Sequence, residues 1–325
     1  MESNTVTSWD VFLCVLFGLM AFCIISGNIF CLVVLRGVNS VHQSTKVMMA
    51  SLSVADLCFG VFVVLPVIGT VAVGTMPYGM TFCTIFAFAG VFFPRAGIAC
   101  ILVINVDRFI AISRPLHYFK IVNTRRAVFA VVIAWSIALS LTCLLAFLPG
   151  SDTVYHGQFH MCFFTRAVSS KSSSTYLVGV ILIVVSIALP ILVSTVLYAL
   201  ICRIARRHTE RMTVSGGGCV IVTLESLSTS DTGSNKGSTN RPSIKSNTKA
   251  AKTFFIVTAG FVVAWLPFLI ILMYEGLENT VVPRWLADLA LIAVFSSSWW
   301  NVVIFYVRNA GFRKRAMQLL RLRRG

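Results

Sequence analysis

Charged side chains are scarce in this sequence, and acidic ones are the scarcest. Only 12% of the 325 residues are charged, with 11 Asp and Glu against 27 Lys and Arg, whereas soluble domains carry about 25%. The sequence also contains no P-loop, no His-Glu-x-x-His and no Gly-x-Ser-x-Gly pattern, which are signatures of common enzyme classes. The composition therefore argues against a soluble protein, and the missing motifs argue against an enzyme.

Long apolar runs are what the chain has instead, since 57% of its residues are hydrophobic. A bilayer core about 30 Å thick is crossed by about 20 apolar residues in a helix. Seven stretches qualify, at residues 11–35, 47–73, 82–112, 127–148, 176–202, 253–273 and 285–307. We therefore predict an all-α fold, a seven-transmembrane helix bundle over residues 11–308. Residues 1–10 carry no Lys or Arg, unlike the start of a cleaved signal peptide, so they are expected to remain as an extracellular N-terminus.

The basic residues lie almost entirely on one side of the predicted spans. All Lys and Arg except Arg95, Arg166, Lys171 and Arg284 fall in, or at the ends of, segments that would share one side of the membrane. Basic loops stay in the cytosol, so we predict a multi-pass protein of the cell membrane with its C-terminus in the cytosol. The net charge of +16 then reflects topology and attraction to membrane lipids, and no nucleic-acid partner is expected.

Two cytosolic segments differ from the spans in composition. The loop at about 204–248 is rich in Ser, Thr, Gly and Asn and poor in apolar residues, so it is predicted to be disordered. In the segment 309–325, Phe312, Ala316 and Leu319 share one side of a helix whose other positions carry Arg and Lys. This pattern predicts a short amphipathic helix and tail on the membrane surface.

A few polar side chains lie inside the predicted spans, where each is costly and is a functional candidate. Asp56 lies in the middle of the second span, and Asn28, Ser298 and Asn301 lie at comparable depth in the first and seventh. Their oxygens could hold a Na⁺ ion, or the side chains could serve only as hydrogen bonds between helices. A Na⁺ near Asp56 is the one inorganic cofactor that the sequence suggests.

The third span carries an arginine in the run Phe93-Pro94-Arg95. A guanidinium at this depth needs a partner. It could anchor the carboxylate or phosphate of a ligand, because its planar fork suits two parallel hydrogen bonds. It could equally be capped by backbone carbonyls and Ser186, with no ligand involved.

Each predicted span contains a landmark residue or motif, and their order and spacing are specific together. They are Gly27-Asn28, Leu52–Asp56, Cys83 with Asp107-Arg108, Trp135, Pro190 with Tyr198, Phe261 with Trp265-Leu-Pro267-Phe268, and Asn301 followed by Phe312. From Asn28 to Phe312 the chain resembles the rhodopsin-like (class A) G-protein-coupled receptors. The stretch from Lys249 into Trp265–Phe268 most resembles their biogenic-amine branch.

The resemblance implies a receptor that passes an outside signal to a heterotrimeric G protein. Arg108 would be held by Asp107 at rest and exposed when span six moves outward, and Leu116 would contact the Gα subunit. The remaining positions of this coupling switch are Tyr198, Asn301 and Phe305.

The resemblance also implies a disulfide and a ligand pocket on the outer side. Cys83 and Cys162 both fall outside by the charge-derived topology, where thiols oxidise, and the family joins these two positions. Trp265 would lie under the ligand beside Phe261, close to the kink that Pro267 introduces. The tentative pocket residues are Gly90, Pro94, Arg95, Ser186, Trp265, Phe268 and Phe295.

The chain departs from the family at positions that matter for ligand and coupling. Amine receptors carry an aspartate where Gly90 stands, so an ammonium ligand would lack its counterion. Opsins carry a lysine for the retinal Schiff base where Phe295 stands, so no retinal is expected. Span seven has Val302 and Phe305 where the family has proline and tyrosine, and Gly97 stands where a serine usually helps to hold sodium. The ligand is therefore unidentified, and the strength of coupling is open.

Two alternatives follow from these departures. A receptor-fold protein that is constitutively active, or that does not signal, would explain the unusual seventh span. A transporter would instead show inverted repeats and broken helices around a midplane site, and the sequence shows neither.

Overall fold

The computed structural model describes residues 7–39, 41–147, 151–166, 186, 188–204, 244–278 and 280–322. Its helices are α1 (Ser8–Gly37), α2 (Gln43–Phe59), η1 (Gly60–Val64), α3 (Leu65–Val73), α4 (Gly79–Ser113), α5 (Tyr118–Ile121), α6 (Thr124–Ala146), α8 (Ile244–Glu278), α9 (Arg284–Arg308) and α10 (Ala310–Leu322). A further apolar helix covers Ala188–Ile204. Two strands, β1 (Ser151–His156) and β2 (Met161–Arg166), form a hairpin.

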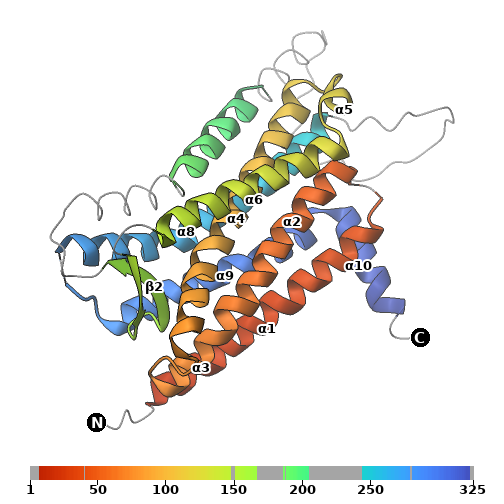
Figure 1. The fold of residues 1–325 in the computed structure, drawn as a ribbon. Coiled ribbons are helices and arrows are strands. Elements are labelled where there is room, and N and C mark those ends of the chain that lie inside the picture. Colours follow the sequence, from red (N-terminus) through yellow and green to blue (C-terminus); the bar gives the residue numbers. More distant parts are fainter. Residues whose placement is uncertain are drawn as a thin grey trace, which may run out of the picture.

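The long helices run side by side as a bundle (Figure 1). Within the described part of the chain, six helical segments are long and apolar enough to cross a membrane. They are Ser8–Gly37, Gln43–Val73, Gly79–Ser113, Thr124–Ala146, Thr253–Glu275 and Arg284–Arg308. Each overlaps a predicted span. The first part of the predicted fifth span, 176–202, lies mostly outside the described residues, and Ala188–Ile204 supplies its second part.

The outer surface of the bundle is apolar. Phe22 of α1 and Val263 of α8, for example, are 70% and 71% exposed. An apolar surface of this extent is unfavourable in water and is the expected surface of a bundle that lipid surrounds. The helices therefore bury one face in the bundle and turn another toward the hydrocarbon.

The second span bends at η1, a π-helical turn between α2 and α3. Pro66 lies in the first turn of α3, where it has no N–H to continue the α-helical pattern, and the wider turn accommodates it. Gly60 brings the span close to α1, because an added Cβ would lie 2.7 Å from Cγ2 of Ile24. The hydrophobic pattern predicted one continuous helix and gave no sign of this turn.

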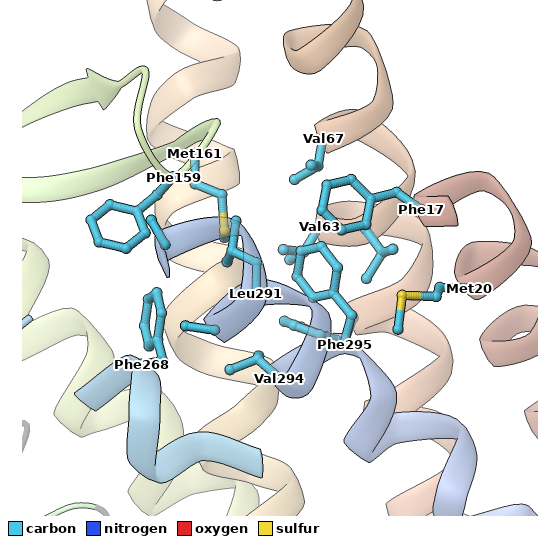
Figure 2. Close-up of a cluster of buried hydrophobic side chains, with 14 of the residues drawn as sticks. Phe17, Met20, Val63, Val67, Phe159, Met161, Phe268, Leu291, Val294 and Phe295 are labelled. Atoms are coloured by element: carbon cyan, nitrogen blue, oxygen red, sulfur yellow. The ribbon is translucent and has the colours of Figure 1, made fainter. Parts of the chain in front are cut away.

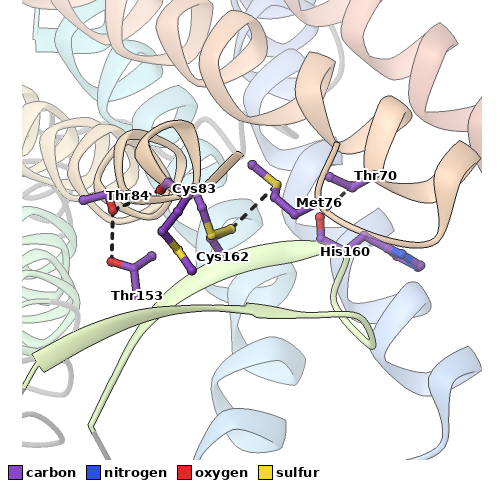
Figure 3. Close-up of a disulfide and its surroundings, with 8 residues drawn as sticks. Thr70, Met76, Cys83, Thr84, Thr153, His160 and Cys162 are labelled. Carbon is purple, nitrogen blue, oxygen red and sulfur yellow. Dashed lines mark hydrogen bonds between the residues drawn. A yellow bond between two sulfur atoms is a disulfide. The ribbon is translucent and has the colours of Figure 1, made fainter. Parts of the chain in front are cut away.

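The β-hairpin covers one end of the bundle, which we call the hairpin end. Its antiparallel register pairs Val154 with Phe163 and Tyr155 with Cys162. A disulfide joins Cys162 to Cys83 at the start of α4, with their Cα atoms 5.5 Å apart (Figure 3). The predicted disulfide is confirmed, whereas the hairpin is an addition to the predicted all-α fold.

The turn of the hairpin is inserted into the bundle rather than lying on it. Phe159, His160 and Met161 are all buried, and His160 adopts a left-handed backbone with φ of 53°. Thr70 of α3 fixes this backbone, since its Oγ1 donates to the carbonyl oxygen of His160 at 2.7 Å (Figure 3). The turn thereby becomes part of the core at the hairpin end.

That core joins elements that are far apart in sequence (Figure 2). Phe17 of α1 packs edge-on against Phe295 of α9, with ring centroids 5.3 Å apart, and Phe159 of the turn packs edge-on against Phe268 of α8 at 5.5 Å. Between them lie Val63, Val67, Met161, Leu291 and Val294.

The opposite end of the bundle carries α5 and α10, and we call it the α10 end. Its core includes Phe254 of α8 and Phe305 of α9. Phe312 and Ala316 of α10 are buried in the same cluster, which attaches α10 to the bundle. The predicted helix after span seven is therefore present, and its place on a membrane surface stays a prediction.

Candidate functional site

A cavity of about 110 Å³ lies between the hairpin and the middle of the bundle. Its walls come from α4, α8, α9 and the hairpin strand β2. The predicted pocket residues that line it are Gly90, Pro94, Arg95, Trp265, Phe268 and Phe295. Ser186 is not among the lining residues, but its hydroxyl is bonded to Arg95. The structure thus brings the predicted pocket together.

Aromatic rings form the floor of this cavity. Trp265 stacks on Phe261, with ring centroids 5.5 Å apart and planes 18° apart, and lies at 89° to Phe268. Pro267 follows inside α8. The indole Nε1 of Trp265 is buried and has no hydrogen-bond partner among the described residues, so the one polar atom of the floor is available to a ligand or a water.

The hairpin closes the cavity from its own end of the bundle. Met161 lines the cavity, and its Cε lies 3.2 Å from the position that a Cβ on Gly90 would occupy. A larger residue at position 90 would push Met161 aside. The glycine that replaces the aspartate of amine receptors therefore makes room for the protein's own hairpin.

Buried ionic groups fasten the hairpin to two helices. The Nε2 of His160 lies 3.2 Å from Oδ1 of Asp288 in α9, and the indole of Trp9 in α1 donates to Oδ2 of the same carboxylate at 2.8 Å. Arg284 of α9 pairs with Asp10 of α1, and its guanidinium also lies 3.5 Å from His160. Nothing local in the sequence links these groups, and of them only Arg284 was singled out from the sequence, as a basic residue off the basic side.

Arg95 is buried at 6% exposure between α4, α6 and the helix segment at Ser186. Its Nε donates to Oγ of Ser186 at 3.1 Å, and its Nη1 donates to Oγ1 of Thr142 at 3.3 Å and to the carbonyl oxygen of Leu141 at 3.4 Å. These contacts match the prediction of capping by carbonyls and Ser186. All of the acceptors are neutral, and Arg95 still lines the cavity.

The predicted sodium site is a second, smaller cavity of about 10 Å³, which Trp265 also lines. A cavity of this volume holds about one water-sized particle. Asp56, Ser298 and Asn301 line it, and Nδ2 of Asn301 donates to Oδ2 of Asp56 at 2.8 Å. Asn28 is not among the lining residues, and its Nδ2 donates to the backbone oxygen of Ser298 at 3.2 Å. The three lining side chains offer carboxylate, hydroxyl and amide oxygens, which suit Na⁺, and the ion itself stays a prediction.

At the α10 end, Asp107 and Arg108 form the predicted pair. Oδ2 of Asp107 accepts from Nε of Arg108 at 3.0 Å and from Oγ1 of Thr45 in α2 at 3.2 Å. Its Oδ1 accepts from the hydroxyl of Tyr118 in α5 at 2.8 Å. Burial, with the nearby charge of Asp107, raises the pKa of Tyr118 to about 12, so the phenol keeps its proton and remains a donor. Thr45 and Tyr118 are partners that the sequence analysis missed.

The other predicted switch residues lie apart from one another. Leu116, in the turn between α4 and α5, is 80% exposed. Tyr198 stacks on Phe255 of α8, with ring centroids 3.9 Å apart, whereas Phe305 of α9 is buried against Phe254 at 5.8 Å. None of the described contacts joins Tyr198 to Phe305.

These features define a helical membrane protein, with a cavity near one end of the bundle and a held arginine at the other. Residues 27–305 match the family model of the 7 transmembrane receptors of the rhodopsin family. The chain belongs to this family, so it is a G-protein-coupled receptor and not an enzyme, and the predicted seven-span fold is confirmed.

Individual relatives are distant but cover most of the chain. It is 24% identical over 298 residues to "Rhodopsin, GQ-coupled" of Mizuhopecten yessoensis, which takes in 90% of this chain and 56% of that protein's length. It is 26% identical over 310 residues to G-protein coupled receptor 52 of Bos taurus, covering 93% of this chain and 79% of the relative. It is 28% identical over 330 residues to the D(1A) dopamine receptor of Xenopus laevis, covering 94% of this chain and 71% of the relative. The likeness to amine-receptor sequences is thus confirmed.

Proposed function

We propose that this receptor activates a heterotrimeric G protein through an outward movement of α8 at the α10 end. The observation that carries the proposal is the confinement of Arg108. Its guanidinium is held by Asp107 and covered by Phe254 of α8, whose ring centroid lies 5.9 Å away. If α8 moves outward, the ring leaves and the arginine becomes accessible from the α10 end.

The surface around this arginine suits a protein partner. Leu116 presents an apolar side chain at 80% exposure, and its burial in a pocket on Gα would remove that apolar surface from water. The excess of Lys and Arg in the loops of this end supports its place in the cytosol. We accordingly place the hairpin and the N-terminus outside the cell, where a ligand enters the cavity above Trp265.

Nucleotide exchange on purified Gα subunits, measured with the receptor in lipid nanodiscs, tests the coupling. We expect exchange that falls at least about tenfold in Arg108→Ala, because a charge-assisted contact is worth about 1.5 kcal/mol or more. The matched control is Arg36→Ala, which removes an exposed arginine at the end of α1 on the same side. Equal exchange by Arg108→Ala and the unaltered receptor would contradict the proposal, as would silence of the receptor toward every Gα family.

A second form of the proposed function, in which the receptor is active without a soluble ligand, has its own support. Because Met161, Phe163 and Phe164 of β2 already line the cavity, we propose as this second form that the hairpin itself holds the receptor active without a soluble ligand. This form predicts high exchange with no ligand added and lower exchange in Met161→Ala, which removes the side chain that reaches Gly90. A ligand-dependent receptor predicts low basal exchange that Met161→Ala does not lower.

The cofactor expectations belong to the same proposal. We propose Na⁺ as an optional ion at Asp56, Ser298 and Asn301, and no retinal, because Phe295 occupies the lysine position. Replacing Na⁺ with a bulky organic cation should lower the thermal stability of the receptor but not that of Asp56→Asn, and equal behaviour of the two proteins would contradict the sodium site.

A further inference from the structure

Arg95 is a buried cation to which the described residues offer no anion. Two arginine–carboxylate pairs, of Arg108 and Arg284, and one histidine–carboxylate contact, of His160, occur among the described residues. The hydrogen bonds of Arg95 all reach neutral oxygens. A guanidinium that only dipoles satisfy keeps an uncompensated charge in a region of low dielectric constant, which is costly.

The rest of the sequence does not supply a counterion at this depth. The undescribed stretch 167–185, which precedes Ser186, contains no Asp or Glu. Asp56 is an acidic residue in the middle of a span, but it lines the smaller cavity and not the one that Arg95 lines. There it accepts from Nδ2 of Asn301. Among the residues that the structure describes, the positive charge in the cavity wall therefore has no negative partner.

The residues that line the rest of the cavity determine the charge and polarity of a ligand that can bind there. None of the described residues that line it is an Asp or a Glu, and its walls are apolar and aromatic, with Phe59, Val91, Leu269 and Leu291 among them. A cationic ligand would meet Arg95 and no carboxylate, so it is disfavoured. A doubly charged phosphate ester would leave one charge unpaired in the same apolar space. A carboxylate matches the single charge of the guanidinium, whose Nη2 donates to none of the described residues.

From the burial of Arg95, its neutral partners and the acid-free apolar cavity, we infer that the ligand is an apolar monocarboxylate. Its carboxylate pairs with Arg95, and its hydrocarbon lies over Trp265. The inference rests on the proposed function, because it takes this cavity as the site of the ligand. Such a molecule reaches the cavity either from water or from the bilayer, and the chemistry at Arg95 is the same.

The test is a series of probes that differ only in the head group. Saturated chains of eight to fourteen carbons as carboxylates, as primary amides and as alkylammonium ions are added to the receptor in phosphatidylcholine nanodiscs, and the midpoint of thermal unfolding is recorded. We expect the best carboxylate to raise the midpoint by about 5 °C near saturation and its amide and ammonium analogues to have little effect. Palmitate is incorporated in the nanodisc lipid to test entry from the membrane. A larger shift of the unfolding midpoint with palmitate than with water-soluble octanoate would indicate that the ligand enters from the bilayer.

Two variants place the effect at Arg95. Arg95→Gln removes the charge and should abolish the advantage of the carboxylate over its amide, while Arg95→Lys keeps a point charge and should retain part of it. Arg36→Gln, an exposed arginine on α1, controls for unspecific attraction of anions and should leave the advantage intact. If Arg95→Gln does not fold, the head-group series on the unaltered receptor decides alone.

Several results would overturn the inference. They are a shift from the amide or the ammonium ion that equals the carboxylate's, no shift at any chain length, or a carboxylate shift that persists in Arg95→Gln. These results are separable from the coupling test. A receptor that catalyses nucleotide exchange but ignores carboxylates refutes only the ligand class, and one that binds carboxylates without exchange refutes only the coupling.

Discussion

Buried ionic groups occur at both ends of the bundle, but they connect different parts of the chain. At the hairpin end, His160 of the loop, Asp288 of α9 and Trp9 of α1 meet across sequence separations of 128 and 279 residues. At the α10 end, Asp107 and Arg108 are neighbours in one helix. Each arrangement joins three elements, since Thr45 of α2 and Tyr118 of α5 also donate to Asp107. The first fastens a loop between two helices, whereas the second ends on one arginine side chain that can change partners.

This difference indicates which end is built to move. Detaching the hairpin requires the loss of several long-range bonds and acts against the disulfide, which no thermal motion breaks. Releasing Arg108 requires that its guanidinium leaves Asp107 and Thr45 and that Phe254 withdraws. We infer that the hairpin stays fastened to the bundle while the α10 end changes shape.

The largest effect is expected from removing the covalent link at the hairpin end. Cys83→Ser opens a loop closed over 79 residues, which should cost about 4 kcal/mol of stability and abolish most delivery to the cell surface. Flow cytometry with an extracellular tag measures the loss. Cys23→Ser, at an exposed free cysteine of α1, should be delivered normally, and normal delivery of Cys83→Ser would show that the ionic contacts alone secure the hairpin.

The next effect concerns the ionic contacts themselves. Asp288→Asn leaves His160 and Trp9 without their buried carboxylate, and breaking a buried pair of this kind costs about 3 kcal/mol. Thermal unfolding of the purified receptor measures it. Asp152→Asn makes the same chemical change at an exposed position of the hairpin strand β1 and should have little effect. Similar midpoints for the two variants would remove Asp288 from the fastening of the hairpin.

At the α10 end the expected effect is on activity more than on stability. Asp107→Asn removes the charge that holds Arg108 and should raise basal nucleotide exchange about tenfold. Tyr118→Phe removes only the hydrogen bond to Oδ1 of Asp107 and should give a smaller increase in the same assay. If neither variant changes basal exchange, the pair does not restrain the receptor.

The smallest structural effect is expected from Leu116→Ala. Because this side chain is 80% exposed, its truncation should change the free energy of unfolding by less than about 0.5 kcal/mol. Exchange on Gα should nevertheless slow about fivefold if the leucine is a contact of the partner. Phe119→Ala, at a half-exposed neighbour in α5, is the control, and an equal effect of both changes would argue against a specific anchor.

Much of the bundle could be predicted because transmembrane helices are encoded locally. The apolar runs located the observed spans, and the spacing of Asp107-Arg108 and of Trp265 with Pro267 located the switch and the floor of the cavity. The start of α8 at Ile244 was missed, because the segment before the sixth span has few apolar residues although Lys249, Ala250 and Ala251 favour helix.

The features that could not be predicted all depend on contacts between distant segments. The burial of Asp288 depends on Trp9 and His160, and the closure of the cavity depends on a loop turn whose sequence has no apolar periodicity. The turn at η1 likewise depends on how Pro66 packs against its neighbours. Charge counting placed Asp10 and Arg284 on the correct common side but could not show that they form a pair.

The contact between Met161 and Gly90 makes these two positions epistatic. Introducing an aspartate at position 90 restores the amine counterion of the related receptors only if the methionine also yields, since its Cε lies 3.2 Å from the new Cβ position. Gly90→Asp alone should therefore lower the stability of the receptor. The double variant with Met161→Ala should be more stable than the sum of the two separate changes predicts. At this site, therefore, the ligand chemistry is set by a helix and a loop together.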